Sequence, residues 1–252
     1  MPTAFSGTAA ALLVAAACFG PASIAHAGPS DYVYTPIVAE GEREIDFKFG
    51  SAESRDGKRA SASSLGFGYG VTSFWFTEAY VKANRQTPDG WRFDAFEWEN
   101  KFQLTEAGKY PVDTGWIVEL ERPRDRSEGW ELKWGPLFQA DLMQSIQANV
   151  NVLLQRHYRS VAPSALELGY QWQVKYRWIK ELEVGAQGFG TVGPWRDWLP
   201  RSQQQHSAGP AVFGKLRLND GKRVLAYNAA WLVGANAATP RNTVRLQIEY
   251  EF

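Results

Sequence analysis

The fold is decided by the stretch LELGYQWQVKYRW, residues 166–178. Apolar residues occupy every second position over its whole length, and the positions between them are polar or small. A period of two is the pattern of a β-strand that has one apolar face and one polar face. Strands of soluble sandwiches rarely sustain this alternation for so long. The stretch therefore predicts a strand that separates an apolar environment from a polar one.

The same alternation closes the chain, in TVRLQIEYEF at residues 243–252. Alternation and turn residues together divide the chain into twelve candidate strands. Their connections are alternately long and short, which favours a single all-β domain, a transmembrane antiparallel up-and-down β-barrel of about 12 strands. The expected strands lie near 42–50, 63–72, 74–85, 91–104, 110–121, 130–140, 145–156, 165–178, 181–192, 209–218, 223–235 and 243–252.

Ten or fourteen strands stay open as alternatives, because the segment 91–104 changes parity near Asp94 and Ala95. Such a change indicates a β-bulge. No apolar run after residue 27 approaches the length that a membrane helix needs. Hydrocarbon offers no hydrogen-bond partner, so a sheet that crosses it must close on itself.

Composition excludes several other classes of protein. The 27 Lys and Arg balance the 27 Asp and Glu, so no basic excess indicates a nucleic-acid binder. A hydrophobic content of 44% excludes a disordered chain. The single cysteine, Cys18, excludes an intramolecular disulfide framework and a thiolate metal cluster.

The first residues have the pattern of a secretory signal peptide. Residues 1–27 contain no charged side chain, and Ala25-His26-Ala27 fits the small-x-small cleavage rule. Residues 28–41 are then expected to form a periplasmic N-terminal segment, and residues 42–252 the barrel. A lipoprotein anchored at Cys18 is a weaker alternative, since the residues before it lack the usual large aliphatic side chain.

With its signal peptide, hairpin series and terminal strand, the chain resembles Gram-negative outer-membrane β-barrel proteins. This resemblance implies location in the bacterial outer membrane and recognition of Ile248, Tyr250 and Phe252 by the barrel-assembly machinery. The glycine often found earlier in that terminal strand is replaced here by Arg245. A soluble barrel such as a lipocalin is the alternative, in which the terminal Phe and the signal would be coincidental.

The alternate face of the strands is densely ionic, with more acids than bases. Charges in a narrow interior need water or a partner, so the lumen is either a charge-lined passage or a salt-bridged wall without transport. The residues expected to line it are Glu44, Asp46, Lys48, Glu78, Lys82, Glu97, Glu99, Lys101, Glu119, Glu121, Glu131, Lys133, Glu167, Lys175, Arg177, Lys215, Arg217, Arg245 and Glu249.

Three glycines, Gly66, Gly68 and Gly70, fall on the inward face of one expected strand. Missing side chains there leave room for something that crosses the lumen, or allow the sheet to bend. On the outer side, the loop with Arg122, Arg124 and Arg126 is expected to contact anions, above all lipopolysaccharide phosphates.

Signals of an enzyme are poor. His157 and His206 are the only histidines after residue 27, and no Gly-x-Ser-x-Gly elbow is present. A pairing of either histidine with Asp125 or Asp197 can be imagined, but no catalytic residue is assigned. We expect no cofactor and no metal site. The prediction is a passage for small polar or charged solutes, with a non-conducting surface scaffold as the alternative and an outer-membrane hydrolase as a weaker one.

Overall fold

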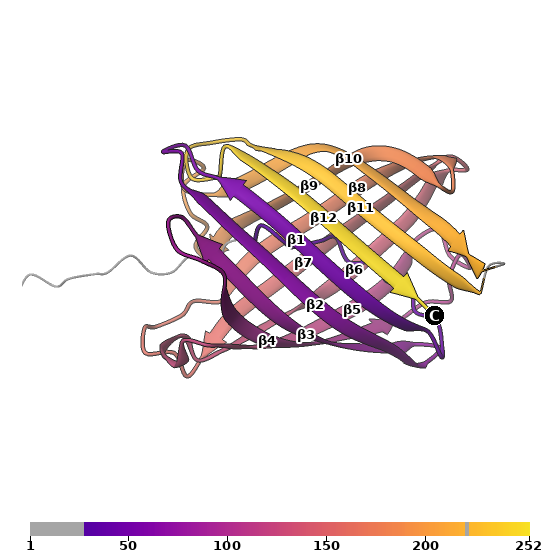
Figure 1. Ribbon diagram of the computed structural model, residues 1–252, viewed down its shortest axis with the longest axis horizontal. Helices are drawn as coiled ribbons and strands as arrows, with labels where there is room; N and C mark the ends of the chain where they lie inside the picture. Colours follow the sequence, from indigo (N-terminus) through magenta and orange to yellow (C-terminus); the bar gives the residue numbers. More distant parts are fainter. Residues whose placement is uncertain (1–27, 220–221) are drawn as a thin grey trace, which may run out of the picture.

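The computed structural model describes residues 28–219 and 222–252. Each strand pairs antiparallel with its sequence neighbours, and the last strand pairs with the first, so the sheet is a closed barrel (Figure 1). The predicted twelve-stranded up-and-down barrel is confirmed. The strands are β1 (Arg43–Glu53), β2 (Arg59–Thr72), β3 (Trp75–Gln86), β4 (Arg92–Gln103), β5 (Asp113–Pro123), β6 (Trp130–Met143), β7 (Ile146–Tyr158), β8 (Glu167–Ile179), β9 (Leu182–Pro194), β10 (Gln205–Leu218), β11 (Arg223–Gly234) and β12 (Asn242–Glu251), with one 3-10 turn, η1 (Arg126–Glu128).

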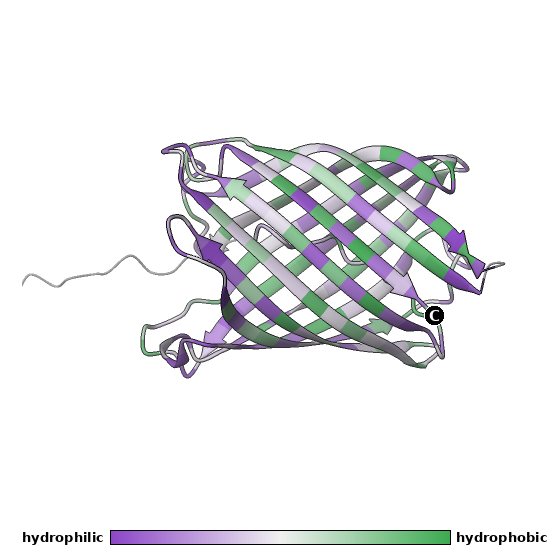
Figure 2. Ribbon diagram, in the orientation of Figure 1, coloured by the Kyte–Doolittle hydropathy of each residue, from purple (hydrophilic) through white to green (hydrophobic). Residues whose placement is uncertain are grey.

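Hydropathy alternates along the strands as the sequence pattern predicts (Figure 2). In β1, Asp46 and Lys48 are buried, whereas Ile45 and Phe47, which alternate with them, are 42% and 39% exposed. Apolar side chains thus cover the outside of the barrel, where hydrocarbon is their favourable solvent. No helix in the described ranges is long and apolar enough to span a membrane.

The change of parity expected near Asp94 and Ala95 is a bulge in β4. Lys82 of β3 pairs with Ala95, but the next residue, Ala83, pairs with Phe93. Asp94 is therefore an extra residue in the ladder, and its carboxylate accepts a 2.6 Å hydrogen bond from Asn84. The bulge keeps the strand count at twelve, because the residues on both sides of it belong to one strand.

Two strands begin earlier than expected. β2 starts at Arg59, not 63, and β10 starts at Gln205, not 209. The added residues of β2 pair with the end of β1, up to Arg59 opposite Glu53. The added residues of both strands include no large apolar side chain, which explains why the sequence pattern did not reveal them.

We name residues 28–41 the lumen segment, because most of it packs inside the barrel, whereas Ala39, Glu40 and Gly41 are exposed. The sequence analysis did not foresee this packing, and the periplasmic position expected for the segment stays a prediction. Val33, Tyr34 and Val38 are buried by the surrounding strands. The backbone comes so close to the wall that a Cβ atom on Gly50 would lie 1.7 Å from the carbonyl oxygen of Pro29.

Of the three inward glycines of β2, Gly70 makes room for a segment that crosses the lumen, whereas Gly66 and Gly68 make room for the wall side chains Tyr80 and Phe76. A Cβ atom on Gly70 would lie 1.9 Å from the carbonyl oxygen of Ala39, so the lumen segment passes over this position. Two backbone hydrogen bonds, from Gly41 to Gly70 and from Gly70 to Glu42, join the segment to β2. The missing side chain is what lets the two backbones meet.

Replacing Gly50 by valine will displace the lumen segment. The atoms that a Cβ would meet there all belong to Pro29 and Ser30, so the segment moves and the strand stays. Hydrogen exchange followed by mass spectrometry should show faster exchange in peptides covering 30–40. Gly90→Val is the matched control, because nothing lies within 4 Å of its Cβ position. Equal exchange in both variants would contradict this packing.

Candidate functional site: the charged lumen

The predicted lumen residues occupy the inward positions of their strands. Most belong to a wall formed by β1 and β3 to β6. Cross-strand register sets carboxylates side by side in this wall: Glu78 faces Glu99, Glu99 faces Glu119, and Glu97 faces Glu121. Like charges directly opposite one another repel, so this arrangement needs cations among the acids.

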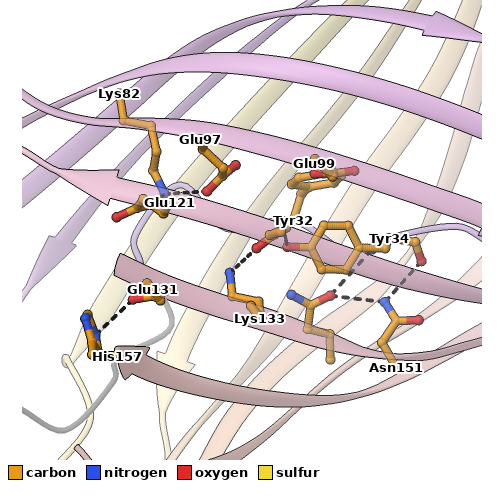
Figure 3. Close-up of polar contacts among 12 residues, drawn as sticks. Tyr32, Tyr34, Lys82, Glu97, Glu99, Glu121, Glu131, Lys133, Asn151 and His157 are labelled. Carbon is orange, nitrogen blue, oxygen red and sulfur yellow. Dashed lines mark hydrogen bonds and ion pairs between the residues drawn. The ribbon is translucent and has the colours of Figure 1, made fainter. Parts of the chain in front are cut away.

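Lysines supply those cations. Lys82 Nζ lies 2.9 Å from a carboxylate oxygen of Glu97 and 2.5 Å from one of Glu121 (Figure 3). Lys133 Nζ lies 2.7 Å from Glu119 Oε2. Each lysine thus separates carboxylates that the register brings together.

A third cation, Lys48, is buried in the lumen. Lys48 Nζ is 3.1 Å from Asp46 and lies between two rings, 3.5 Å from the centroid of Tyr32 and 3.7 Å from that of Tyr80. The Tyr80 hydroxyl donates a 2.8 Å hydrogen bond to Asp46. Cation–π contacts of this kind gain strength where water is excluded. Tyr32 therefore ties the lumen segment to the ionic wall.

The lumen segment also donates hydrogen bonds to the acids. The hydroxyl of Tyr32 donates to Glu99 Oε2 at 2.7 Å, and that of Tyr34 donates to Glu119 (Figure 3). Further along, the Val38 amide donates a 2.7 Å hydrogen bond to Gln103 Oε1. A phenolic hydroxyl is a hydrogen-bond donor, so Tyr32 and Tyr34 supply Glu99 and Glu119 with donors that the lysines do not provide.

The opposite wall is lined by amides, which the sequence analysis did not single out. Asn149 donates to Gln139 at 3.0 Å, Gln173 to Asn149 at 3.0 Å, and Gln187 to Gln173 at 3.1 Å. Asn151 Nδ2 donates to the carbonyl oxygen of Tyr34 at 3.1 Å. The signal was present in the alternation of Asn and Gln at 147–151 and 171–173, which puts Gln171 and Gln173 on the inward face, but no role was assigned to the amides.

Apolar side chains inside the lumen were likewise missed. Val33 packs in a buried cluster with Phe189, Ala211, Phe213, Ala230 and Leu232. Tyr34 packs with Ile117, Leu137 and Leu153. These wall positions have inward parity yet are apolar, because the lumen segment and not water covers them.

Charges at the short-turn end of the barrel also have partners. Lys215 pairs with Glu251 at 3.1 Å, and Arg177 with Asp141 at 2.9 Å. Lys101 lies 4.9 Å from the ring centroid of Phe76, and Lys175 lies 4.7 Å from that of Phe213. The predicted residues Glu44, Arg217 and Glu249 occupy inward positions at this same end.

The two histidines are apart from the aspartates that an enzyme site would require. His157 Nε2 lies 3.1 Å from Glu131, and its Nδ1 lies 3.1 Å from the carbonyl oxygen of Glu128. His206 Nδ1 is 2.7 Å from the hydroxyl of Tyr170. Neither contact includes the imagined partners Asp125 and Asp197.

Three lumen carboxylates, Glu97, Glu99 and Glu119, have ligand oxygens within 4.8 Å of one another. Oxygen donors of this kind suit hard cations such as Ca²⁺. The lysine and tyrosine contacts described above already engage each of the three. The sequence analysis expected no metal site, and it did not foresee this grouping.

The arginines of the outer loop differ from one another. Arg122 belongs to β5, where it donates to the carbonyl oxygen of Gly129, and its Cζ lies 4.9 Å from the ring centroid of Trp130. Arg124 and Arg126 are exposed. Hydrogen bonds from Ser127 hold the pKa of Asp125 below its ordinary value, so a negative charge persists between the two exposed arginines.

A small cavity lies between the lumen segment and the wall. Asp31, Lys133, Gln171 and Phe189 line it, together with Glu167, and its volume is about 30 Å³. That volume accommodates one or two water molecules and no larger solute. In this conformation the lumen segment therefore fills the space that a solute would need at this level.

Comparisons with known proteins identify the fold. No protein-family model and no curated protein matches the sequence. The KdgM porin in complex with disordered oligogalacturonate is similar in structure, with a TM-score of 0.55 and 8% identity over 83% of this chain and 99% of the porin. The NanC porin matches with a TM-score of 0.52 and 8% identity over 83% and 98%. An outer membrane channel from Pseudomonas putida F1 matches with a TM-score of 0.56 and 12% identity over 88% and 98%.

Replacing Lys82 by methionine will destabilise the barrel. Two largely buried carboxylates, Glu97 and Glu121, lose their shared cation, and we expect a loss of about 2–3 kcal/mol after allowance for partial exposure of the lysine. Denaturant unfolding of the folded protein in detergent measures it. Stability should return when Glu97→Gln and Glu121→Gln are added, and Lys58→Met, at an exposed loop pair, is the control. A Lys82→Met variant as stable as the parent would show that these two ion pairs contribute nothing to the free energy of unfolding.

The identities to these structures are low, so the likeness concerns the fold. The closed barrel, the apolar outside and the polar lumen agree with it. The roles expected of Ile248, Tyr250 and Phe252 in assembly stay predictions; in the structure the Phe252 amide donates to the carbonyl oxygen of Arg43, and its ring stacks on Tyr250. The location in the outer membrane stays a prediction from the sequence, and the chain has the fold of bacterial outer-membrane β-barrel porins and channels.

Proposed function

We propose that this protein is a narrow, charge-lined passage for small polar or charged solutes, and that the lumen segment closes it. The observation that carries the proposal is the pair of unlike walls, one ionic and one of amides, on both sides of a segment that is not part of the sheet. A barrel that needed its interior only for stability would not require so many hydrogen-bonding groups, because apolar packing stabilises a protein interior as well as buried ion pairs do, or better.

The contacts of the lumen segment are suited to reversible closure. Tyr32, Tyr34 and Val38 each donate a hydrogen bond to a side chain of the wall. Single hydrogen bonds contribute about 1 kcal/mol each, and the burial of Val33 and Tyr34 adds to them, but the segment has no continuous backbone ladder such as holds a strand. Its departure would leave carboxylates and amides that water or a solute can satisfy in its place.

The KdgM porin provides one further argument. It is a barrel of similar fold that has been solved in complex with a disordered oligogalacturonate, so a polar, charged molecule is one ligand that a barrel of this fold can bind. This supports passage through the lumen of our chain. It assigns no particular solute and no enzymatic role, and we propose a transport function without a catalytic one.

Conductance in planar bilayers tests the proposal. The parent protein should be nearly silent with rare openings, whereas Gly50→Val should conduct steadily, because its lumen segment is displaced. Gly90→Val, whose added side chain meets nothing, should behave as the parent. Silence of a Gly50→Val variant that shows the faster exchange described above would refute passage and favour a non-conducting scaffold. A parent that conducts as well as Gly50→Val would refute closure by the segment.

The scaffold alternative has its own supporting observation, the exposed Arg124 and Arg126 near η1. We propose that these two side chains contact lipopolysaccharide phosphates, while Arg122 is engaged by Gly129 and Trp130. Replacing both by glutamine should reduce the amount of lipopolysaccharide that co-purifies in low salt. Each arginine near an anionic surface contributes about 1 kcal/mol of binding free energy. The exposed Arg223, at the other end of the barrel, is the control position. Equal lipopolysaccharide in parent and double variant contradicts the contact.

A further inference from the structure

Arg245 is a buried cation in the lumen, and two of its three guanidinium nitrogens have no hydrogen-bond partner among the described residues. It lies in β12, its side chain is 7% exposed, and neither Nε nor Nη1 has a hydrogen-bond partner. Its Cζ lies 4.1 Å from the ring centroid of Phe189, so a ring contact replaces hydrogen bonding. Leaving a buried guanidinium without acceptors costs free energy, which indicates that the site is arranged for an acceptor that is not part of the wall.

The nearest candidate for that acceptor is on the lumen segment. Asp31 and Lys133 line the same small cavity, and Phe189, which contacts Arg245, lines it as well. The Asp31 carboxylate is therefore a nearby negative charge for Arg245, although the two form no direct ion pair among the described residues.

The surroundings of this cavity define the kind of molecule that fits. Guanidinium N–H groups bind a carboxylate through two parallel hydrogen bonds, and a lysine adds a further donor. Gln155 and Thr191 offer groups that bond hydroxyls, and the rings of Tyr170 and Phe189 offer apolar faces. A small hydroxylated carboxylate satisfies these features once the lumen segment has moved away, because the closed cavity accommodates no more than one or two water molecules.

We propose that Arg245, Lys133 and the cavity beside them form a binding site for a small hydroxylated carboxylate, whose place the Asp31 carboxylate takes while the lumen is closed. The inference rests on the proposed function, since it assigns a solute class to the passage. A solute carboxylate that replaces Asp31 removes one attraction that holds the lumen segment, so binding favours opening. The coupling is reciprocal: any change that releases Asp31 strengthens binding of the solute.

Binding to the folded, full-length mature protein in detergent tests this site without any need for transport. The probe is D-gluconate, followed by saturation-transfer NMR titration, with the uncharged sorbitol as the matched ligand control. Arg245→Gln should weaken gluconate binding roughly tenfold or more, because a charge-assisted pair of hydrogen bonds is lost. Asp31→Asn should strengthen it several-fold, and sorbitol should bind no variant measurably better than the parent.

Two further variants separate this site from general effects of charge. Arg223→Gln removes a positive charge from an exposed position outside the lumen and should leave gluconate binding unchanged. The gain from Asp31→Asn should vanish when Arg245→Gln is also present, because the two groups act on the same ligand. Circular dichroism and heat-modified electrophoretic migration confirm that each variant is folded.

The possible results distinguish the proposed binding site from the proposed passage. Gluconate binding that is equal in Arg245→Gln and the parent, or an Asp31→Asn gain that persists without Arg245, overturns the site. Binding with the expected pattern in a protein whose Gly50→Val variant stays silent in bilayers supports the site and refutes passage. Conduction by Gly50→Val without gluconate binding refutes the site and leaves the passage supported.

Discussion

The structure depends on one constraint: a sheet that closes in hydrocarbon must turn every second side chain into its own interior. In this barrel that requirement sets acids opposite acids, because β3, β4 and β5 carry glutamates at matching inward positions. Repulsion between them is relieved by lysines that lie between two strands, as Lys82 does. The wall is therefore stable only as a network, and no single glutamate can be understood without its neighbours.

The lumen segment satisfies what the wall leaves open. It offers phenolic hydroxyls to Glu99 and Glu119, and it places Val33 among apolar side chains. One short stretch thus supplies the barrel with a small core on one side and hydrogen-bond donors on the other. A barrel with this lining would otherwise hold water against apolar residues such as Ile117 and Phe189, which is unfavourable.

Most of the architecture could be predicted from the sequence, because strand alternation is a local property. The alternation at 166–178 predicted β8, and the parity change near Asp94 predicted the bulge. The glycine series at 66–70 indicated room for something that crosses the lumen, but nothing local named residues 28–41 as the occupant. Their contacts join positions far apart along the chain, such as Tyr34 and Gln171 or Tyr34 and Asn151.

The roles of the amides and of the inward apolar residues were not predicted, for a related reason. A rule that divides residues into apolar outside and polar inside treats Gln173 as filler and has no place for Phe213. Both are explained only when the lumen is seen as a packed interior: Gln173 joins a chain of amide hydrogen bonds, and Phe213 covers Val33. Closure by such a segment differs from closure by the wall itself, since the strands hold one another through continuous backbone ladders and the segment through scattered side-chain contacts. The lumen segment, which belongs to no backbone ladder, is therefore the part of the interior that can leave without unfolding the barrel.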